Sequence, residues 1–378
     1  MGSRQARCDD ERPAALRISL AALLAGGGSG VSRYTVALSR ALDEVAHEFP
    51  ELRLTLVTTA AGAASVSPRN LGVRELGLRL RQVDRGPVRV PLEQVLVADT
   101  PADLVHFFDL SGPLLRPRRP FVTTMHDAGV VYGFRRIRHA YKRRLWPWAL
   151  RRAAAVVAVS QFTKDEALRH FDVPAGQIHV IHSGPGLAPP AGAETSDETA
   201  DPYLLYVGDL STKKNVTFLV RAFDRADVPG RLVLAGRPAD GYRELAEQIE
   251  RSDKRGRIEL RDGSADDELD RLYRGATALL HPSRYEGFGF TPLEAMARGC
   301  PVLATDIAAI REVSGEGAML LPLDDEAAWA DAIARVAGDE ATRSQLRTRG
   351  ASTAARYSWT RTARELCKLF LSLRPGVG

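Results

Sequence analysis

Short apolar runs alternate with amphipathic stretches along the first half of the chain. The runs LRISLAAL, LRLTLVTT, LVHFF, FVTTMH, AAVVAVS and IHVIH are typical of buried strands. Segments with the apolar spacing of a helix lie between them, for example Ser32–Phe49 and Thr163–Phe171. Because strands that alternate with helices form βαβ units, the pattern predicts an α/β domain with a parallel sheet over residues 14–185.

This periodicity is lost over residues 184–202, where GPGLAPPAGAETSDETADP has the composition of a linker. The strand pattern then resumes with YLLYVG, RLVLAG, IELRDG, ATALLHPS, PVLATD and AMLLPLD. Helical segments such as Asp266–Gly275 and Glu326–Ala337 separate these runs. We therefore expect a second α/β domain over residues 200–356, followed by a helix at residues 357–374.

Composition narrows the class of protein. Of the 378 residues, 44% are hydrophobic and 26% are charged, which is typical of a soluble globular protein. No apolar run approaches the roughly 20 residues of a transmembrane helix. The three cysteines form no motif for a disulfide framework or a zinc site, which favours a cytoplasmic location. A formal net charge of +5 is too small to indicate a nucleic-acid partner.

Two carboxylates, Glu286 and Glu294, bracket a Gly-Phe-Gly-Phe loop between a predicted strand and a predicted helix. Thr291 can act as the N-cap of this helix, with Pro292 in its first turn and Glu294 completing a capping box. Glu294 is therefore either a helix-start residue or a ligand-binding carboxylate. Glu286 precedes glycines that allow a ligand to approach the backbone. Carboxylates can accept hydrogen bonds from sugar hydroxyls, and exposed backbone amides can bind a phosphate, so the pattern suits a sugar attached to a phosphate.

The two aromatic residues of this loop have two possible roles. Phe288 and Phe290 alternate with Gly287 and Gly289, and each ring can either contact a ligand or anchor the core. The sequence favours the core position for Phe290, because Phe288 has a glycine on both sides.

Paired lysines follow another predicted strand. Gly208 ends the run YLLYVG, and Lys213 and Lys214 come just before the helical segment VTFLVRAF. A lysine held at this place can neutralise a leaving diphosphate. The alternative is a solvated pair of charges.

Loops in the first domain carry further candidates. Gly28 and Gly30 belong to a glycine-rich loop after the first strand, but Arg33 breaks the dinucleotide fingerprint G-x-G-x-x-G. His126 and Asp127 follow the run FVTTM and are placed to bond sugar hydroxyls, although a lone histidine is often structural. Motifs for metalloproteases, P-loops, nucleophile elbows and metal-bound nucleotides are missing from the sequence.

Together these motifs resemble the retaining glycosyltransferases of family four, which have the GT-B fold of two facing Rossmann-like domains. The resemblance covers residues 16–370 and is carried by RYEGFGFTPLEAMARGCPVLATD. Glu286 and Glu294 match the E-x7-E element of that family. Lys214 matches the lysine that this family carries before its helix. His126 matches the histidine of the family, and Gly28–Gly30 match its N-terminal glycine loop.

The resemblance implies transfer of a hexose from a UDP-, GDP- or dTDP-sugar to a hydroxyl acceptor, with retention and without a required metal or cofactor. It implies that Glu286, His126 and Lys214 act in catalysis, and that Asp127 contacts the acceptor. The final helix is expected to cross back to the first domain. The expected donor-binding residues are Gly28, Gly30, Gly208, Lys213, Lys214, Gly287, Phe288, Gly289, Phe290, Thr291 and Glu294.

One departure from the family concerns Asp209, which stands where many relatives carry Arg or Thr. A carboxylate beside two phosphates is unfavourable. Either Lys213 takes over the phosphate contact, or Asp209 points elsewhere.

The segment FRRIRHAYKRRLWPWALRR, residues 134–152, holds eight basic residues, two tryptophans and no acid. This composition suits peripheral contact with an anionic membrane at the inner face, or contact with an anionic acceptor. An ordinary helix with buried tryptophans is the alternative, and Pro147 is expected to interrupt it.

Several alternatives remain open at the level of sequence. The acceptor is either a cell-surface glycan or lipid-linked sugar, or the core of a small secondary metabolite. A catalytically silent sugar-nucleotide sensor is a second hypothesis. A nucleotide-dependent oxidoreductase is a third, which the broken glycine fingerprint disfavours.

Overall fold

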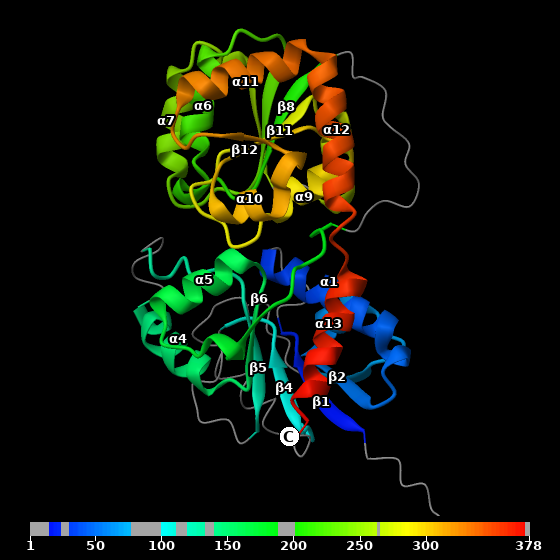
Figure 1. Ribbon diagram of the computed structural model, residues 1–378. Helices are drawn as coiled ribbons and strands as arrows, with labels where there is room; N and C mark the ends of the chain where they lie inside the picture. Colours follow the sequence, from blue (N-terminus) through cyan, green and yellow to red (C-terminus); the bar gives the residue numbers. More distant parts are fainter. Residues whose placement is uncertain are drawn as a thin grey trace, which may run out of the picture.

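The protein consists of two α/β lobes (Figure 1). Residues of both lobes line a cleft. The computed structural model describes residues 15–23, 30–76, 100–110, 119–132, 140–187, 201–262 and 265–374. One sheet forms the centre of each lobe, and all strand pairs in both sheets are parallel. The predicted architecture of two facing α/β domains is confirmed.

The first sheet has seven strands in the order β3-β2-β1-β4-β5-β6-β7. Every residue of β4, β5 and β6 is buried, as expected for strands covered by helices on both faces. The strands are β1 (Leu16–Ala21), β2 (Leu52–Thr59), β3 (Gly72–Leu76), β4 (Leu104–Phe107), β5 (Phe121–Met125), β6 (Ala155–Ala158) and β7 (Ile178–Val180).

Strand β3 is the one strand of this sheet that the apolar pattern did not predict. Among the strands that the structure describes, it lies at the edge of the sheet and pairs only with β2. Its sequence GVREL has no apolar run, and Val73 is 42% exposed. An edge strand with little burial leaves no hydrophobic signal in the sequence.

Helix α1 packs against the core of the first lobe with one face. Its buried residues include Tyr34, Leu38, Leu42 and Val45, which recur at the spacing of one helix face. Within the described residues, the helices of this lobe are α1 (Gly30–Val45), α2 (Ala60–Val66), α4 (Ala140–Arg152) and α5 (Gln161–His170), with short 3-10 turns at Ala46–Glu48 and Ala175–Gln177.

The second sheet has six strands in the order β10-β9-β8-β11-β12-β13, and all six were predicted from the sequence. The strands are β8 (Tyr203–Val207), β9 (Arg231–Ala235), β10 (Ile258–Arg261), β11 (Ala278–His281), β12 (Val302–Thr305) and β13 (Met319–Leu321). The helices of this lobe are α6 (Val216–Arg225), α7 (Tyr242–Arg251), α8 (Asp266–Gly275), α9 (Phe290–Met296), α10 (Ala308–Ser314), α11 (Glu326–Gly338) and α12 (Glu340–Ala354).

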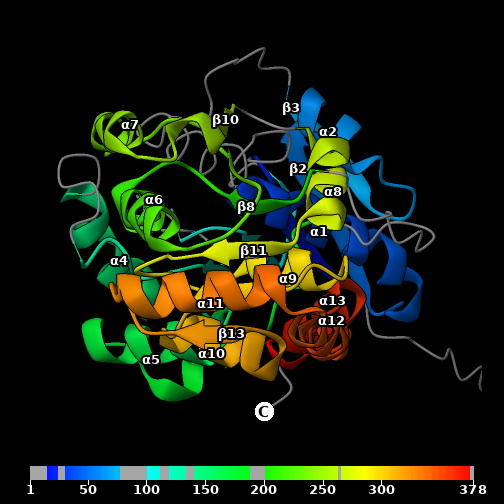
Figure 2. The same ribbon diagram turned by 90° about the horizontal axis from the view of Figure 1, so that it is seen from above.

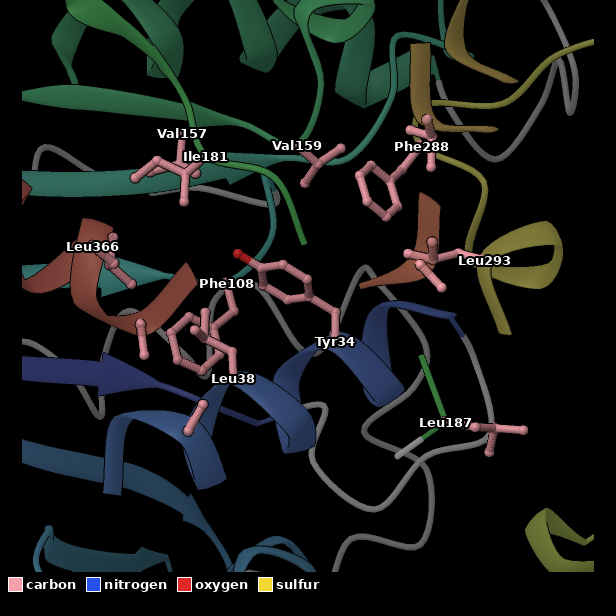
Figure 3. Packing of buried hydrophobic residues seen from close by; sticks show 14 of the residues in the cluster. Tyr34, Leu38, Phe108, Val157, Val159, Ile181, Leu187, Phe288, Leu293 and Leu366 are labelled. Atoms are coloured by element: carbon pink, nitrogen blue, oxygen red, sulfur yellow. The ribbon is translucent and has the colours of Figure 1, made fainter. Parts of the chain in front are cut away.

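The last helix, α13 (Trp359–Ser372), leaves the second lobe and packs against α1 in the first (Figures 1 and 2). Its buried residues include Leu366 and Phe370, and the Phe370 ring lies 5.6 Å from the His106 ring, measured between centroids. Figure 3 shows Leu366 in one apolar cluster with Tyr34 of α1 and Phe288 of the second lobe. The core is therefore continuous across the two lobes.

A carboxylate on α10 docks the second lobe onto α5 of the first. Glu312 accepts hydrogen bonds from the backbone N–H groups of Gln161 at 2.6 Å and Phe162 at 2.8 Å. His182 also lies 2.8 Å from Glu312, through its Nε2 atom. Burial alone raises the pKa of Glu312, but the bonds from His182 and the two amides outweigh it, and the pKa is lowered. Glu312 thus acts as a helix cap supplied by the other lobe.

We expect Glu312→Ala to lower stability by about 1 kcal/mol, the usual contribution of a cap, or a few degrees in thermal midpoint. Because the pKa of Glu312 is lowered on folding, its contribution is present at neutral pH and is lost as the pH falls below about 4.5. Thermal unfolding at several pH values checks this, with exposed Glu316→Ala as control. A difference between wild type and Glu312→Ala that grows in acid contradicts it.

Candidate active site

The loops at the carboxyl ends of both sheets line a cleft of about 1210 Å³. The strand order reverses between β1 and β4 in the first sheet and between β8 and β11 in the second, and such reversals are where ligands bind in parallel sheets. Gly28 lies outside the described residues. The other predicted site residues all line the cleft: Gly30, His126, Asp127, Gly208, Lys213, Lys214, Glu286, Gly287, Phe288, Gly289, Phe290, Thr291 and Glu294.

The start of α9 differs from its predicted form. Gly289 is the N-cap, with a φ of +114° that L side chains rarely adopt, and no side chain caps the helix. Thr291 lies inside the first turn, so the predicted capping box of Thr291 and Glu294 is wrong. Pro292 occupies the first turn, as predicted. Glu294 therefore has no capping role.

Glu286 lies in a compact group of charges. Lys214 Nζ is 2.5 Å from Glu286 Oε1, and His281 Nε2 is 3.1 Å from the same oxygen. Burial favours the neutral carboxyl, but Lys214 and His281 outweigh it and hold the pKa of Glu286 well below its usual range. Burial also lowers the pKa of His281. Glu286 is therefore ionised and held in place at neutral pH.

Glu294 is 1% exposed and lies between the two lobes. Tyr273 of α8 donates a hydrogen bond of 2.8 Å to Glu294 Oε2, and Arg33 of α1 lies 3.7 Å from Oε1. Burial raises the pKa of Glu294, although Arg33 and Tyr273 act in the opposite direction. The carboxylate is thus buried with few partners, and it faces space that a ligand can fill.

The paired lysines point in different directions, and only Lys213 reaches across the cleft to the first lobe. Lys213 Nζ lies 3.3 Å from Asp127 Oδ2 in the first lobe and 5.0 Å from the centroid of the Tyr285 ring. Lys214 turns instead to Glu286. Desolvation raises the pKa of Asp127, but Lys213 and the backbone N–H of Gly129 outweigh it, and the pKa is lowered. This arrangement contradicts a purely solvated pair of lysines.

Asp209, the departure from the family pattern, faces a cation that the sequence analysis did not identify. Asp209 Oδ1 lies 3.6 Å from Arg237 Nη2. Arg237 follows the end of β9 and also lines the cleft. Asp209 itself also lines the cleft, and the two alternatives, that Lys213 takes over the phosphate contact or that Asp209 points elsewhere, stay predictions.

His126 lies at the end of β5 with one ring nitrogen committed to the backbone. Its Nε2 lies 2.8 Å from the carbonyl oxygen of Phe108, and its ring stands edge-on to Tyr34 with centroids 4.5 Å apart. The Nε2–H donates, because a carbonyl oxygen can only accept. In the neutral form of the ring, the lone pair is therefore on Nδ1.

Both loop phenylalanines contact the core and line the cleft, and Phe288 is the more deeply buried of the two, contrary to expectation. Phe288 is 3% exposed and belongs to the core cluster shown in Figure 3. Phe290 is only partly buried and stacks on Trp359, with ring centroids 6.3 Å apart. The glycines beside Phe288 allow the backbone to bend so that this ring enters the core.

Two family models match the chain. The model described as Glycosyltransferase Family 4 matches residues 28–185, and the model described as Glycosyl transferases group 1 matches residues 193–353. The chain is a glycosyltransferase of family four.

This glycosyltransferase is 28% identical to the O-antigen chain mannosyltransferase B of Escherichia coli, over 63% of this chain and 66% of that protein, just under two thirds of its length. It is also 28% identical to the D-inositol 3-phosphate glycosyltransferase of Corynebacterium glutamicum, over 93% of this chain and 90% of that protein.

Solved structures share its fold. Sucrose-phosphate synthase from Thermosynechococcus elongatus has a TM-score of 0.73 and 21% identity, covering 95% of this chain and 99% of that one. Alr3699/HepE from Anabaena, in complex with UDP and glucose, has a TM-score of 0.71 and 17% identity, covering 95% of this chain and 100% of that one.

Several residues of the glycosyltransferase site were missed by the sequence analysis. Arg237 follows a predicted strand, so its position at a strand end was a usable signal. His281 is the last residue of β11, and Tyr273 lies on the buried face of α8. Their contacts with Glu286 and Glu294 depend on tertiary packing, which leaves no local pattern.

The basic segment at residues 134–152 of the glycosyltransferase is described only from residue 140 onward. Helix α4 continues through Pro147, so the expected interruption is wrong. Trp146 is 6% exposed and belongs to the core, while Arg152 lies over the Trp148 ring, 4.6 Å from its centroid. Among the described helices, none combines the length and the hydropathy of a bilayer-spanning segment.

We expect the stability advantage of Glu294→Gln over the wild-type glycosyltransferase to grow as the pH rises. Because burial raises the pKa of Glu294, the folded protein binds this proton more tightly than the unfolded chain, and stability is lost as the pH rises above about 4.5 towards the raised value. Glutamine has no proton to lose. Thermal unfolding without nucleotide checks this, with exposed Glu316→Gln as control. A stability advantage of Glu294→Gln that shrinks with rising pH contradicts the assignment.

Proposed function

We propose that this glycosyltransferase moves a hexose from a nucleotide-sugar donor to a hydroxyl acceptor, with retention at the anomeric carbon and without a required metal. The observation that carries the proposal is the grouping of Glu286, Lys214 and Lys213 in one cleft with the buried carboxylate of Glu294. Carboxylates that can accept hydrogen bonds from sugar and ribose hydroxyls then lie beside lysine side chains that can bind a diphosphate. The donor base is that of a UDP-, GDP- or dTDP-hexose.

Glu294 is the proposed ligand of the nucleoside. Its carboxylate accepts hydrogen bonds from ribose hydroxyls, while Tyr273 and Arg33 hold it in place from two sides. A buried carboxylate that gains hydroxyl donors recovers part of the solvation that it lost on folding. Nucleoside binding therefore relieves an unfavourable feature of the free protein.

The lysines are the proposed ligands of the diphosphate. Lys214, Lys213 and nearby Arg237 each already lie close to a carboxylate in the free protein. An ammonium group has three N–H donors, so each lysine can bind a phosphate oxygen and keep part of its carboxylate contact. As the bond between sugar and phosphate breaks, these cations stabilise the negative charge on the leaving group.

Glu286 is the proposed carboxylate beside the reacting sugar. It is ionised, and it is held by Lys214 and His281, so it can accept from a sugar hydroxyl and stabilise positive charge near the anomeric carbon. His126 contacts the donor sugar from the first lobe. Retention follows if the acceptor attacks from the face that the diphosphate leaves, with a phosphate oxygen taking the proton. No enzymic nucleophile is then needed.

Asp127 is the proposed contact of the acceptor, and two acceptor classes remain candidates. The named relatives include an O-antigen mannosyltransferase and an inositol phosphate glycosyltransferase, so glycans and small cyclitols both have support. In either case the acceptor approaches from the first lobe, where Asp127 and His126 lie.

We expect Glu294→Ala to weaken binding of the nucleoside diphosphate about 10- to 100-fold, because the ribose loses charged acceptors. Glu286→Ala is expected to lower kcat about 100-fold with a smaller change in nucleotide affinity. A panel of UDP, GDP and dTDP in thermal unfolding identifies the base first, since a ligand at 100 times its Kd adds about 2.7 kcal/mol of stability.

Kinetics with the matching nucleotide sugar then compare both variants with exposed Glu316→Ala. Negligible effects of Glu286→Ala and Glu294→Ala contradict the assignment. Nucleotide-sugar binding without any turnover favours the silent sensor instead.

Activity is expected to persist in excess chelator, because the lysines and Arg237 supply the positive charge that a metal supplies elsewhere. The product is expected to keep the anomeric configuration of the donor, as measured by NMR coupling constants. A strict requirement for magnesium contradicts the metal-free proposal, and an inverted product contradicts retention.

A further inference from the structure

The start of α5 carries two buried hydroxyl groups that face the second lobe. Ser160 is the N-cap of this helix, and its Oγ accepts a hydrogen bond of 3.0 Å from the backbone N–H of Thr163. Thr163 carries the second hydroxyl, and both Ser160 and Thr163 are 0% exposed. A buried hydroxyl needs a partner for its proton as well as for its lone pairs. The cap accounts only for a lone pair of Ser160.

Both hydroxyl groups lie within hydrogen-bond distance of one backbone carbonyl of the second lobe, and Thr163 Oγ1, 3.0 Å from Ser160 Oγ, is a second and more distant acceptor for the Ser160 proton. Ser160 Oγ donates to the carbonyl oxygen of Gly287 at 2.5 Å, and Thr163 Oγ1 donates to the same oxygen at 3.0 Å. A carbonyl oxygen has two lone pairs, so these two bonds fill its capacity. The first lobe therefore holds a backbone group of the loop that carries Glu286.

The hydroxyl pair also fixes the peptide plane between Gly287 and Phe288. The described residues contain no cis peptide, and in a trans peptide the N–H points opposite to the C=O. The N–H of Phe288 therefore points away from α5. Gly287 has no side chain to restrict rotation of this plane, so its orientation depends on what binds the carbonyl.

We propose that Ser160 and Thr163 are positioning residues for the donor sugar. Their hydroxyls hold the Gly287 carbonyl and so orient the backbone amides that contact the sugar. This inference rests on the proposed role of the loop Gly287–Phe290 in binding the donor. The sugar subsite is complete only when the lobes are docked, whereas the nucleotide contacts of Lys214 lie within the second lobe.

The variants separate this role from helix capping. Thr163→Val removes one hydroxyl at nearly constant shape and leaves the cap of α5 intact. Ser160→Asp keeps a good cap acceptor but has no proton to give to Gly287 at neutral pH. Ser160→Thr and Thr163→Ser restore the hydroxyls. The matched control is Thr35→Val, which removes a buried hydroxyl that bonds only to the Val31 carbonyl of its own helix in the described contacts.

The test compares the affinity for UDP with that for UDP-glucose, and in parallel GDP with GDP-mannose, by titration calorimetry. We expect Thr163→Val and Ser160→Asp to weaken binding of the nucleotide sugar about tenfold, the usual effect of one lost hydrogen bond. Binding of the nucleoside diphosphate is expected to change less than about twofold. Ser160→Thr, Thr163→Ser and Thr35→Val are expected to match the wild type in both measurements.

Three results overturn the inference. If Thr163→Val and Ser160→Asp bind the nucleotide sugar as tightly as the wild type does, the hydroxyls do not position the loop. Normal Ser160→Asp beside defective Ser160→Ala assigns Ser160 to capping alone. If the variants weaken the binding of nucleoside diphosphate and of nucleotide sugar equally, both residues act only in docking the lobes. If the wild type binds neither kind of ligand, the proposed function itself fails, which is a distinguishable outcome.

Discussion

The close approach of two backbones at Gly287 is the constraint on which the site depends. A Cβ built at residue 287 lies 1.8 Å from the carbonyl oxygen of His126, so no other residue fits this position without moving one lobe. The contact brings a loop of the second sheet onto the end of a strand in the first. Ser160, Thr163 and Glu312 then complete the docking with hydrogen bonds. Glycine is needed here for proximity and not for an unusual backbone angle.

Charge compensation is the second organising feature of the cleft. Lys213, Lys214, Arg237 and Arg33 each lie within ion-pair distance of a carboxylate. Pairing lets the protein bury charges that would otherwise be costly to desolvate. It also means that the phosphates of the donor must compete with these carboxylates for the cations. Selectivity for the donor then depends more on hydrogen bonds to the sugar and ribose hydroxyls than on overall electrostatic attraction of its phosphates.

The sequence predicts those parts of the fold whose signal is local. Strands such as Tyr203–Val207 are buried throughout and appear as apolar runs, whereas the exposed edge strand Gly72–Leu76 does not. The E-x7-E loop was found because its glycines and acids are contiguous. Thr291 was placed wrongly because Gly289, with its positive φ, is the N-cap, so the helix starts two residues earlier than predicted. Tyr273 reaches Glu294 only through packing between two helices, and no spacing in the sequence encodes that contact.

The crossing of α13 onto α1 has a consequence for how the chain is made. The second lobe is contiguous in sequence, but the first lobe needs Leu366 and Phe370 to complete its apolar core. A ribosome releases these residues after the whole second lobe has emerged. The lobe that is synthesised second can therefore mature first, which reverses the usual order in which domains fold during translation.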